Sequence, residues 1–487
     1  RDVLGSRGLG DVYKRQMSKN PIKLSATLLG MALVAFTSCE DQDFTDVNND
    51  ATRVEVNTIS AEMAKVRDYV PPYAVMAHRG STFWAPEETE SAWRWAREMG
   101  ADYLESDLQC TKDGVILANH DDNLKRTTNI ENVYGELVPA TRKAFYMRYG
   151  KMSEAEAEKL VEADKASFRP YYAMSYMYEE LLKLDAGSWF NETSIEQARE
   201  AFSEQHQYIS ALEDQIRYAE GKMLKRDANG ERIYTVTGTW NPDKPRDCLT
   251  YKFEYVDDPQ DTGNRPGVYI EFKESWLNPS DFEKRVYNKL DELGWNIITK
   301  PCDGEPFYKN NKVNVGNTNG KVILQTFSLE SLRRTAEEFK GKIPMCFLLW
   351  EGNGATDLKH DTPQGYASFI NLGLEYKAHI IGPCIAGAPN DYPEMNAPWQ
   401  AYLIKKSGML NHPYSFDSYA QMGKYFGQYN WGNTVQYDEL LHGIYGDGLF
   451  TNRSEMSLKY LIDNGLRKAP APQTVPDAVE TLKRLGY

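Results

Sequence analysis

The sequence predicts an α/β fold, a (β/α)8 TIM barrel with helical and loop insertions. Short apolar runs recur from residue 73 onward, end in polar residues, and alternate with stretches of helical periodicity. Strands that are buried on both faces read as nearly continuous hydrophobic runs. Alternation of such strands with helices is typical of a parallel sheet. Eight of these runs are enough to close the sheet into a barrel.

The composition is that of a globular protein. Of the 487 residues, 41% are hydrophobic and 26% are charged, which excludes wholesale disorder and collagen-like repeats. The formal net charge of -14 makes a nucleic-acid partner unexpected, because nucleic acid is itself a polyanion. A small anion could still bind in a local basic pocket. Six cysteines are too sparse for a disulfide framework in a chain of this length.

The start of the chain predicts an export signal. Residues 1–16 look like non-native flanking sequence, and Met17 begins a second plausible N-terminus. In residues 17–38, a short basic region precedes the apolar run Leu24–Phe36, which is too short to span a bilayer comfortably. This pattern is typical of a secretory signal peptide, and Cys39 follows it directly.

The run Phe36-Thr37-Ser38-Cys39 resembles a bacterial lipobox, which implies cleavage before Cys39 and acylation of its sulfur. Plain signal cleavage with an incidental cysteine is the alternative. Residues 39–69 begin with a stretch rich in Asp and Asn and predict an acidic tether. We therefore expect a protein of the bacterial cell envelope, lipid-anchored to the membrane through Cys39, on the periplasmic side or at the cell surface.

The predicted elements follow in order. The strands are expected at Ala74–His78, Tyr103–Gln109, Val115–His120, Val268–Lys273, Val322–Phe327, Cys346–Trp350, His379–Pro383 and Gly448–Asn452. The helices are expected at Ser91–Met99, Pro279–Leu293, Leu329–Phe339 and Pro363–Leu374.

The predicted barrel domain, residues 70–487, is far longer than the roughly 250 residues that such a barrel needs. We expect insertions at about 136–178, which is helical and aromatic, at about 222–266, which is polar with two β-like runs, and at about 385–440, which is rich in Tyr, Asn, Gly and Pro. Loops that follow strands lie on the catalytic face of these barrels. The hypothesis is that the insertions surround the site and determine which substrate it accepts. The alternative is that they are surface loops without a role in the site.

Charged side chains end four successive predicted strands. They are His78 and Arg79, then Glu105 and Asp107, then His120, then Glu271 and Lys273. Side chains at positions i and i+2 of a strand share one face, so the three carboxylates can converge at the barrel mouth. Such a cluster must either raise its pKa values or hold a cation. Ligands that are all oxygen favour Mg²⁺ or Ca²⁺ over Zn²⁺.

The cations and histidines beside this cluster suit phosphate chemistry. Arg79 and Lys273 match phosphate oxygens, and His78 and His120 can act as general acid and base. Each residue alone also has a structural interpretation, as a strand-end histidine, a solvated edge or a same-face ion pair. Their occurrence together favours a site, because buried barrel strands have little structural use for charged residues.

The motifs that carry these residues resemble one family. They are His78-Arg79-Gly80, Pro86-Glu87-Glu88-Thr89, Glu105-Ser106-Asp107, Thr111-Lys112-Asp113-Gly114, His120-Asp121, Leu184–Phe190, Glu271-Phe272-Lys273 and Gly448–Asn452. Together they closely resemble the glycerophosphodiester phosphodiesterase family over about residues 73–463. The N-terminal motifs are specific, and the C-terminal ones are looser.

The resemblance implies a role for each site residue. Glu105, Asp107 and Glu271 would bind one divalent cation, Mg²⁺ or Ca²⁺; His78 and His120 would be the acid–base pair; Arg79 and Lys273 would contact the phosphate of a small phosphodiester substrate. Glu87 would lie beside the metal site or hold Arg79. Two departures put the geometry of the mouth in question: Glu88 stands where the family usually has Asn, and Asn452 where it usually has Asp.

The function implied by the resemblance is metal-dependent hydrolysis of glycerophosphodiesters to an alcohol and glycerol phosphate. The nucleophile is either the glycerol hydroxyl, giving a cyclic phosphate that water then opens, or water directly. One alternative is a cyclising phosphodiesterase like the phosphoinositol lipases. Another is a non-catalytic surface lipoprotein that binds glycan or phosphoglycerol polymer, which would be expected to lose the histidines or carboxylates. The leaving alcohol, the identity of the base and the oligomeric state stay open.

Overall fold

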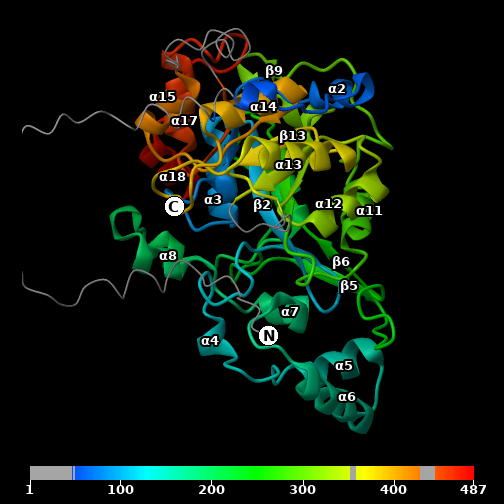
Figure 1. The fold of residues 1–487 in the computed structure, drawn as a ribbon. Coiled ribbons are helices and arrows are strands. Elements are labelled where there is room, and N and C mark those ends of the chain that lie inside the picture. The colour runs from blue at the N-terminus through cyan, green and yellow to red at the C-terminus, as the bar shows by residue number, and fades with distance from the viewer. Residues whose placement is uncertain (1–46, 48–49, 351–357, 428–444) are drawn as a thin grey trace, which may run out of the picture.

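A computed structural model of the chain describes residue 47 and residues 50–350, 358–427 and 445–487 (Figure 1). Its centre is a barrel of parallel strands. They are β1 (Ala74–Ala77), β2 (Tyr103–Cys110), β8 (Gly267–Phe272), β11 (Val322–Thr326), β12 (Met345–Leu349), β13 (Ile380–Pro383), β14 (Leu410–Asn411) and β15 (Gly448–Thr451). The hydrogen-bonded order is β14-β13-β12-β11-β8-β2-β1-β15.

The barrel closes between β14 and β15. Phe416, just beyond β14, forms a parallel bridge with Thr451, and its backbone N–H donates to the carbonyl oxygen of Phe450 at 2.8 Å. The predicted (β/α)8 barrel is therefore confirmed, because no edge of the parallel sheet is left open at this point.

Helices follow the strands in turn and form the outer layer. They are α3 (Glu90–Met99), α10 (Leu212–Ala219), α11 (Phe282–Glu292), α12 (Leu329–Phe339), α13 (Pro363–Glu375), α14 (Pro398–Ser407), α15 (Tyr419–Phe426) and α17 (Ser454–Asp463). The helices α2 (Ala61–Arg67) and α18 (Ala478–Leu485) and the hairpin β9 (Tyr308–Lys309) with β10 (Lys312–Val313) complete this part. The four helices expected from the sequence all form.

The strands are hydrophobic throughout because both of their faces are buried. Tyr269 and Ile323 pack into the cluster that fills the barrel. Their chain neighbours Val268 and Leu324 join the larger cluster between the strands and the outer helices. Alternate residues of one strand therefore serve two different cores, and neither face can tolerate an unpaired polar side chain.

One predicted barrel strand is wrong. The run Val115–His120 forms β3 (Ile116–Ala118), which pairs antiparallel with β2 through a tight turn instead of joining the parallel ladder. The missing barrel strand is β14, within the 385–440 stretch expected to be a loop. Its regular part is two residues long, too short to produce a recognisable hydrophobic run.

Two long excursions leave the barrel, and they make up the lower half of Figure 1. Between β3 and α10 lie α4 (Ile130–Val133), α5 (Arg142–Gly150), α6 (Glu154–Ser167), α7 (Tyr178–Leu181), α8 (Ser188–Thr193) and α9 (Ala201–Glu204). Between α10 and β8 lie β4 (Lys222–Leu224), β5 (Tyr234–Gly238), β6 (Leu249–Phe253) and β7 (Tyr255–Asp257). The two excursions share small apolar cores, one of which holds Phe145, Tyr146 and Trp240. The domain boundaries assigned from the sequence stay predictions.

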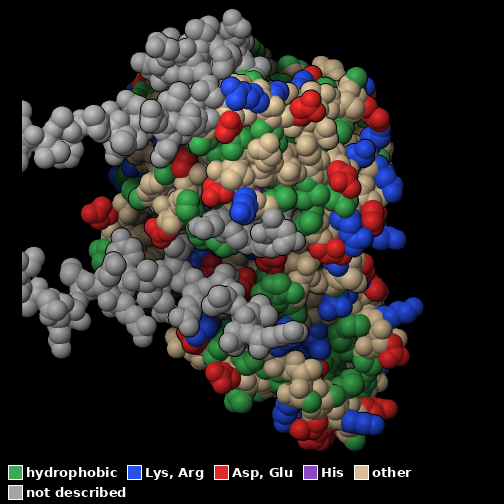
Figure 2. Space-filling view, in the orientation of Figure 1, with side chains coloured by type: hydrophobic (Ala, Val, Ile, Leu, Met, Phe, Trp, Pro, Cys, Tyr) green, Lys and Arg blue, Asp and Glu red, His purple; other side chains and the backbone are tan. Residues whose placement is uncertain are grey.

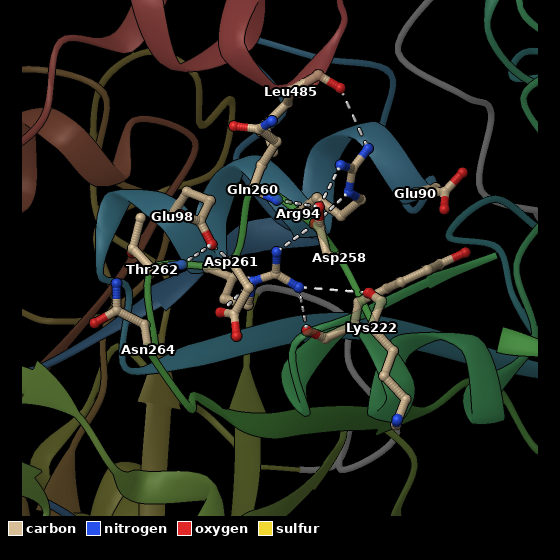
Figure 3. Close-up of polar contacts among 12 residues, drawn as sticks. Glu90, Arg94, Glu98, Lys222, Asp258, Gln260, Asp261, Thr262, Asn264 and Leu485 are labelled. Atoms are coloured by element: carbon tan, nitrogen blue, oxygen red, sulfur yellow. Dashed lines mark hydrogen bonds and ion pairs between the residues drawn. The ribbon is translucent and has the colours of Figure 1, made fainter. Parts of the chain in front are cut away.

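The second excursion is tied to the barrel by a buried ion network (Figure 3). Both oxygens of Asp258 bind Arg94 on α3, at 2.7 and 2.9 Å, and Arg97 Nη2 contacts the same carboxylate at 2.5 Å. The side chains of Asp258 and Arg97 are fully buried. Asp258 therefore bridges two guanidinium groups, and Glu98 Oε1, 2.9 Å from Arg97 Nε, adds a second buried carboxylate to the network.

The described surface mixes charges of both signs. On the face drawn in Figure 2, basic and acidic side chains are interspersed, as expected for a protein without a broad basic surface there. Within the described ranges, no helix has the length and apolar character needed to cross a membrane. The expected signal peptide, residues 17–38, and Cys39 lie outside the described residues.

Asp258→Asn should lower the free energy of unfolding by about 3–5 kcal/mol, because it removes the carboxylate that pairs with the buried guanidinium of Arg94 and one of the carboxylates that pair with Arg97. The measurement is denaturant unfolding followed by circular dichroism. The matched control is Asp257→Asn: Asp257 pairs with Lys222, but its side chain is 93% exposed, so its loss should cost little. Equal effects of the two variants would contradict a structural role for the network.

Candidate active site

Three carboxylates meet at the carboxyl ends of two neighbouring strands. Glu105 and Asp107 lie on β2 and Glu271 on β8, and the parallel register places Asp107 directly beside Glu271. Each offers an oxygen that lies within 4.8 Å of the other two. All three side chains are buried. The structure thus brings together the three residues that the sequence proposed as metal ligands.

The electrostatics of this cluster are unfavourable for three negative charges. Burial, reinforced by the charge of Asp107, raises the pKa of Glu105 well above its usual range. Burial also raises the pKa of Glu271 to about 8, although Lys273 opposes the shift. Burial acts on Asp107 in the same direction, but the attraction of Lys273 and other cationic partners outweighs it and holds its pKa below the usual range. The cluster needs further positive charge to be fully ionised.

The donor set fits a hard divalent cation. The carboxylate oxygens have the chemistry that Mg²⁺ and Ca²⁺ prefer. Oδ2 of Asp107 is buried and accepts no hydrogen bond from any described residue. A buried carboxylate oxygen without a donor is costly unless a cation satisfies it. This oxygen, with no hydrogen bond from a described residue and only the 3.5 Å contact to Arg79 Nε, is compatible with a cation ligand.

Two side-chain cations border the carboxylates. Lys273 Nζ lies 3.1 Å from Glu271 Oε1 and 3.6 Å from Asp107 Oδ1. Arg79 Nε lies 3.5 Å from Asp107 Oδ2. Arg79 has only the longer contact here and Lys273 one close partner, Glu271, so both retain donors for an anion that approaches the cluster.

Arg79 is presented by a strained turn at the end of β1. The residues His78–Gly80 form one turn of 3₁₀ helix in which Arg79 has φ 51°, and the backbone N–H of Arg79 donates to Glu105 Oε2 at 2.8 Å. Gly80 has φ +87°, and a Cβ there would lie 2.6 Å from the Cβ of Ala92. A glycine is therefore required at position 80 for this turn. The turn places the backbone N–H of Arg79 where it can donate to Glu105.

Each candidate histidine is oriented by a hydrogen bond at Nδ1. His78 Nδ1 lies 2.7 Å from Asn452 Oδ1, and His120 Nδ1 lies 2.8 Å from Asp121 Oδ1. Burial, and then the charge of Arg79, lower the pKa of His78 to about 3 and that of His120 to about 4. Both imidazoles are therefore neutral near pH 7 in this state, and either can accept a proton.

Sequence reasoning missed Arg126, which organises the rim of the site. Arg126 donates to both oxygens of Asp121, at 2.7 and 2.9 Å, and to both oxygens of Glu87, at 3.0 and 2.6 Å. Glu87 in turn lies 3.5 Å from Arg79 Nη1. Arg126 belongs to none of the recognised motifs. A salt bridge between two loops does not follow from any regular spacing of residues in the sequence.

The two departures from the family pattern are accommodated within the site. Glu88 Oε1 accepts a hydrogen bond from the backbone N–H of Asp107 at 2.7 Å, so it holds the strand that carries two of the carboxylates. Asn452, as described, holds His78. Gln325 adds a further contact, because its Nε2 donates to Glu105 Oε1 at 2.8 Å.

Fold and site together define a (β/α)8 barrel protein with a carboxylate-lined candidate metal centre beside two imidazoles and two side-chain cations. The profile of the Glycerophosphoryl diester phosphodiesterase family matches residues 78–248. Over this segment the chain is similar to that family. The matched segment contains Glu105 and Asp107 but ends before Glu271 and Lys273, which the fold adds to the site.

Known relatives extend beyond that segment. The chain is 24% identical over 373 residues to a glycerophosphodiester phosphodiesterase of Bacillus subtilis, covering 76% of this chain and 85% of the relative. It is 49% identical over 57 residues to one of Caldanaerobacter subterraneus, covering 12% and 24%. Among solved structures, an Oleispira antarctica phosphodiesterase in complex with the product sn-glycerol-3-phosphate matches with a TM-score of 0.43 and 14% identity, over 81% of this chain and 98% of that one.

Addition of Mg²⁺ or Ca²⁺ to chelator-treated protein should raise Tm, because a ligand that binds only the folded state stabilises it by about 2.7 kcal/mol at one hundred times its Kd. Glu271→Gln should reduce this gain and, in chelator near pH 7, should leave the protein about as stable, since a pKa of about 8 already favours the uncharged form of Glu271. Differential scanning calorimetry measures both effects. Glu158→Gln on the exposed face of α6 is the control. A wild-type Tm indifferent to both cations would contradict a metal centre at the triad.

Proposed function

We propose that the protein hydrolyses glycerophosphodiesters to an alcohol and glycerol phosphate, with one divalent cation, Mg²⁺ or Ca²⁺, held by Glu105, Asp107 and Glu271. The observation that carries the proposal is the convergence of this triad with Arg79 and Lys273 at the carboxyl ends of the barrel strands. Catalytic residues of (β/α)8 barrels lie at this end of the strands.

The phosphate would lie against the two side-chain cations. Arg79 offers a planar guanidinium and Lys273 a compact ammonium, and each keeps N–H donors for non-bridging oxygens beyond those that face the triad. When bound, the divalent cation supplies Lewis-acid polarisation of the phosphoryl group and of a hydroxyl. The burial of the triad strengthens these electrostatic effects, since little water screens them.

The two histidines would move protons at Nε2, because Nδ1 of each is engaged. One takes the proton of the nucleophile, and the other delivers a proton to the leaving alkoxide. Their partners differ in charge: the Asp121 carboxylate stabilises an imidazolium by its negative charge as well as by its hydrogen bond, whereas Asn452 offers only a neutral amide oxygen. This difference favours His120 as the residue that accepts the first proton.

The two alternatives predict different outcomes. A cyclising phosphodiesterase would accumulate a cyclic phosphate, whereas the proposed hydrolase gives glycerol phosphate as the final product; ³¹P NMR of the reaction mixture separates them. A non-catalytic binding protein would be expected to lose catalytic groups. Against it, the triad, both histidines and both cations are all present, and the charged groups lie together.

His120→Ala and His78→Ala should each lower kcat for glycerophosphocholine by about 10²–10⁴-fold, because each removes a proton-transfer group. The assay follows release of glycerol phosphate with Mg²⁺ or Ca²⁺ present. His206→Ala, a histidine of the first excursion that binds the Leu184 carbonyl, should retain nearly full turnover. Near-normal turnover of either variant would remove that histidine from the mechanism, and absence of turnover in the wild type with every cation would overturn the proposed activity.

The predicted location adds a proposal about the N-terminal segment. We propose that the mature protein is anchored in the bacterial envelope by acylation of Cys39. Expression in a bacterium fed with an alkyne fatty acid should label the wild type, and Cys39→Ser should abolish the label and release the protein from the membrane fraction. Equal labelling of both would contradict acylation at this residue.

A further inference from the structure

A second polar cavity lies in the first excursion, apart from the carboxylate triad. Its volume is about 360 Å³, and its charged lining consists of Lys112, Arg142, Arg169 and Asp164. Lys112 comes from the turn between β2 and β3, and the other three come from α5, α6 and the segment just after α6. Trp276, on the loop after β8, forms another part of the wall.

The cavity has an excess of positive charge. The buried guanidinium of Arg142 donates to both oxygens of Glu180 at 2.7 Å and to Asp164 at 2.6 Å. Lys112 Nζ lies 2.9 Å from the other oxygen of Asp164. Two cations and two carboxylates are thereby balanced.

Arg169 stands outside these pairs. Its backbone N–H donates to Ser175 Oγ, but its exposed side chain makes no ion pair with any residue that the structure describes. Three cations against two carboxylates leave one net positive charge in a cavity that already holds two serine side chains. In a chain with a formal net charge of -14, a pocket of this sign is a local exception.

The loop after β8 links the cavity to the carboxylate site. Trp276 follows Lys273 by three residues, so their Cα atoms are at most about 11 Å apart. Trp276 is 49% exposed, and its ring meets the ring of Tyr172, from the excursion, edge-on at a centroid distance of 5.9 Å. One short loop therefore carries both a proposed phosphate contact and a wall of the cavity. Burial raises the pKa of Glu274, which lies between them in the chain, above its usual range.

We propose that this cavity binds an anionic group carried by the leaving alcohol of the phosphodiester substrate. The inference rests on the proposed function and extends it to a substrate class: diesters whose alcohol bears a second phosphate. Arg169 and Lys112 would bind the phosphate oxygens through charge-assisted hydrogen bonds. The exposed ring of Trp276 would cover the carbon chain that links the two phosphates.

Two substrates that differ only in this group test the inference. They are glycerophosphoglycerol, whose leaving alcohol is neutral, and 1,3-bis(glycerophospho)glycerol, whose leaving alcohol carries a phosphodiester anion. Arg169→Gln should raise KM for the second compound about three- to tenfold, with KM for the first and kcat for both unchanged. Arg148→Gln is the control, since Arg148 on α5 is 71% exposed and lies outside the cavity lining.

The outcomes separate the two proposals. An equal change in KM for both substrates, or no change for either, would overturn the second site while leaving the hydrolase intact. If the wild type turned over neither compound, the proposed function would fail. Binding of the two compounds, measured by calorimetry, would then test separately whether the cavity binds an anionic group. Tighter binding of 1,3-bis(glycerophospho)glycerol than of glycerophosphoglycerol by the wild type, lost in Arg169→Gln, would support it; equal affinities would overturn it.

Discussion

Repulsion among three buried carboxylates is the constraint on which the site depends. Glu105 and Asp107 share one face of β2, and the register of the barrel places Glu271 of β8 beside Asp107. Burial withdraws the water that would otherwise screen their charges, so the pKa values of Glu105 and Glu271 rise. A divalent cation relieves this repulsion and at the same time brings its charge to the substrate. The cost of assembling the cluster and its proposed catalytic capacity therefore have the same physical origin.

The barrel supplies the rigidity that such a cluster requires. The strands pack on both faces, and the charged residues appear where the strands leave the core. Around them, backbone and loop contacts fix the orientation of each side chain: the Arg79 N–H holds Glu105, the Asp107 N–H is held by Glu88, and Arg126 joins Asp121 to Glu87. These supporting contacts come from several loops, so a substitution in one loop can displace a group that is carried by another.

The sequence predicted the elements whose pattern is local. Long hydrophobic runs identified most of the barrel strands, and the two-residue periodicity of a strand was enough to predict that Glu105 and Asp107 face the same way. The hydrophobic run of β3 has the same composition as a parallel strand, and only the turn at Thr111–Gly114 reverses its direction. Arg126 joins the nearby Asp121 to Glu87, 39 residues away, and Asn452 holds His78, 374 residues away; one sequence contains no record of such distant pairs. The same holds for the cavity beside Trp276, which needs the first excursion, the β2–β3 turn and a barrel loop to form.

Anomalous diffraction from a crystal of the protein grown with Mn²⁺ tests the central claim most directly. The account predicts one strong anomalous peak in contact with a carboxylate oxygen of each of Glu105, Asp107 and Glu271, at the oxygen–metal distances of about 2.0–2.6 Å that hard divalent cations adopt. The absence of a peak there at saturating Mn²⁺, or a peak bound by other residues while the triad holds only protons, would contradict it.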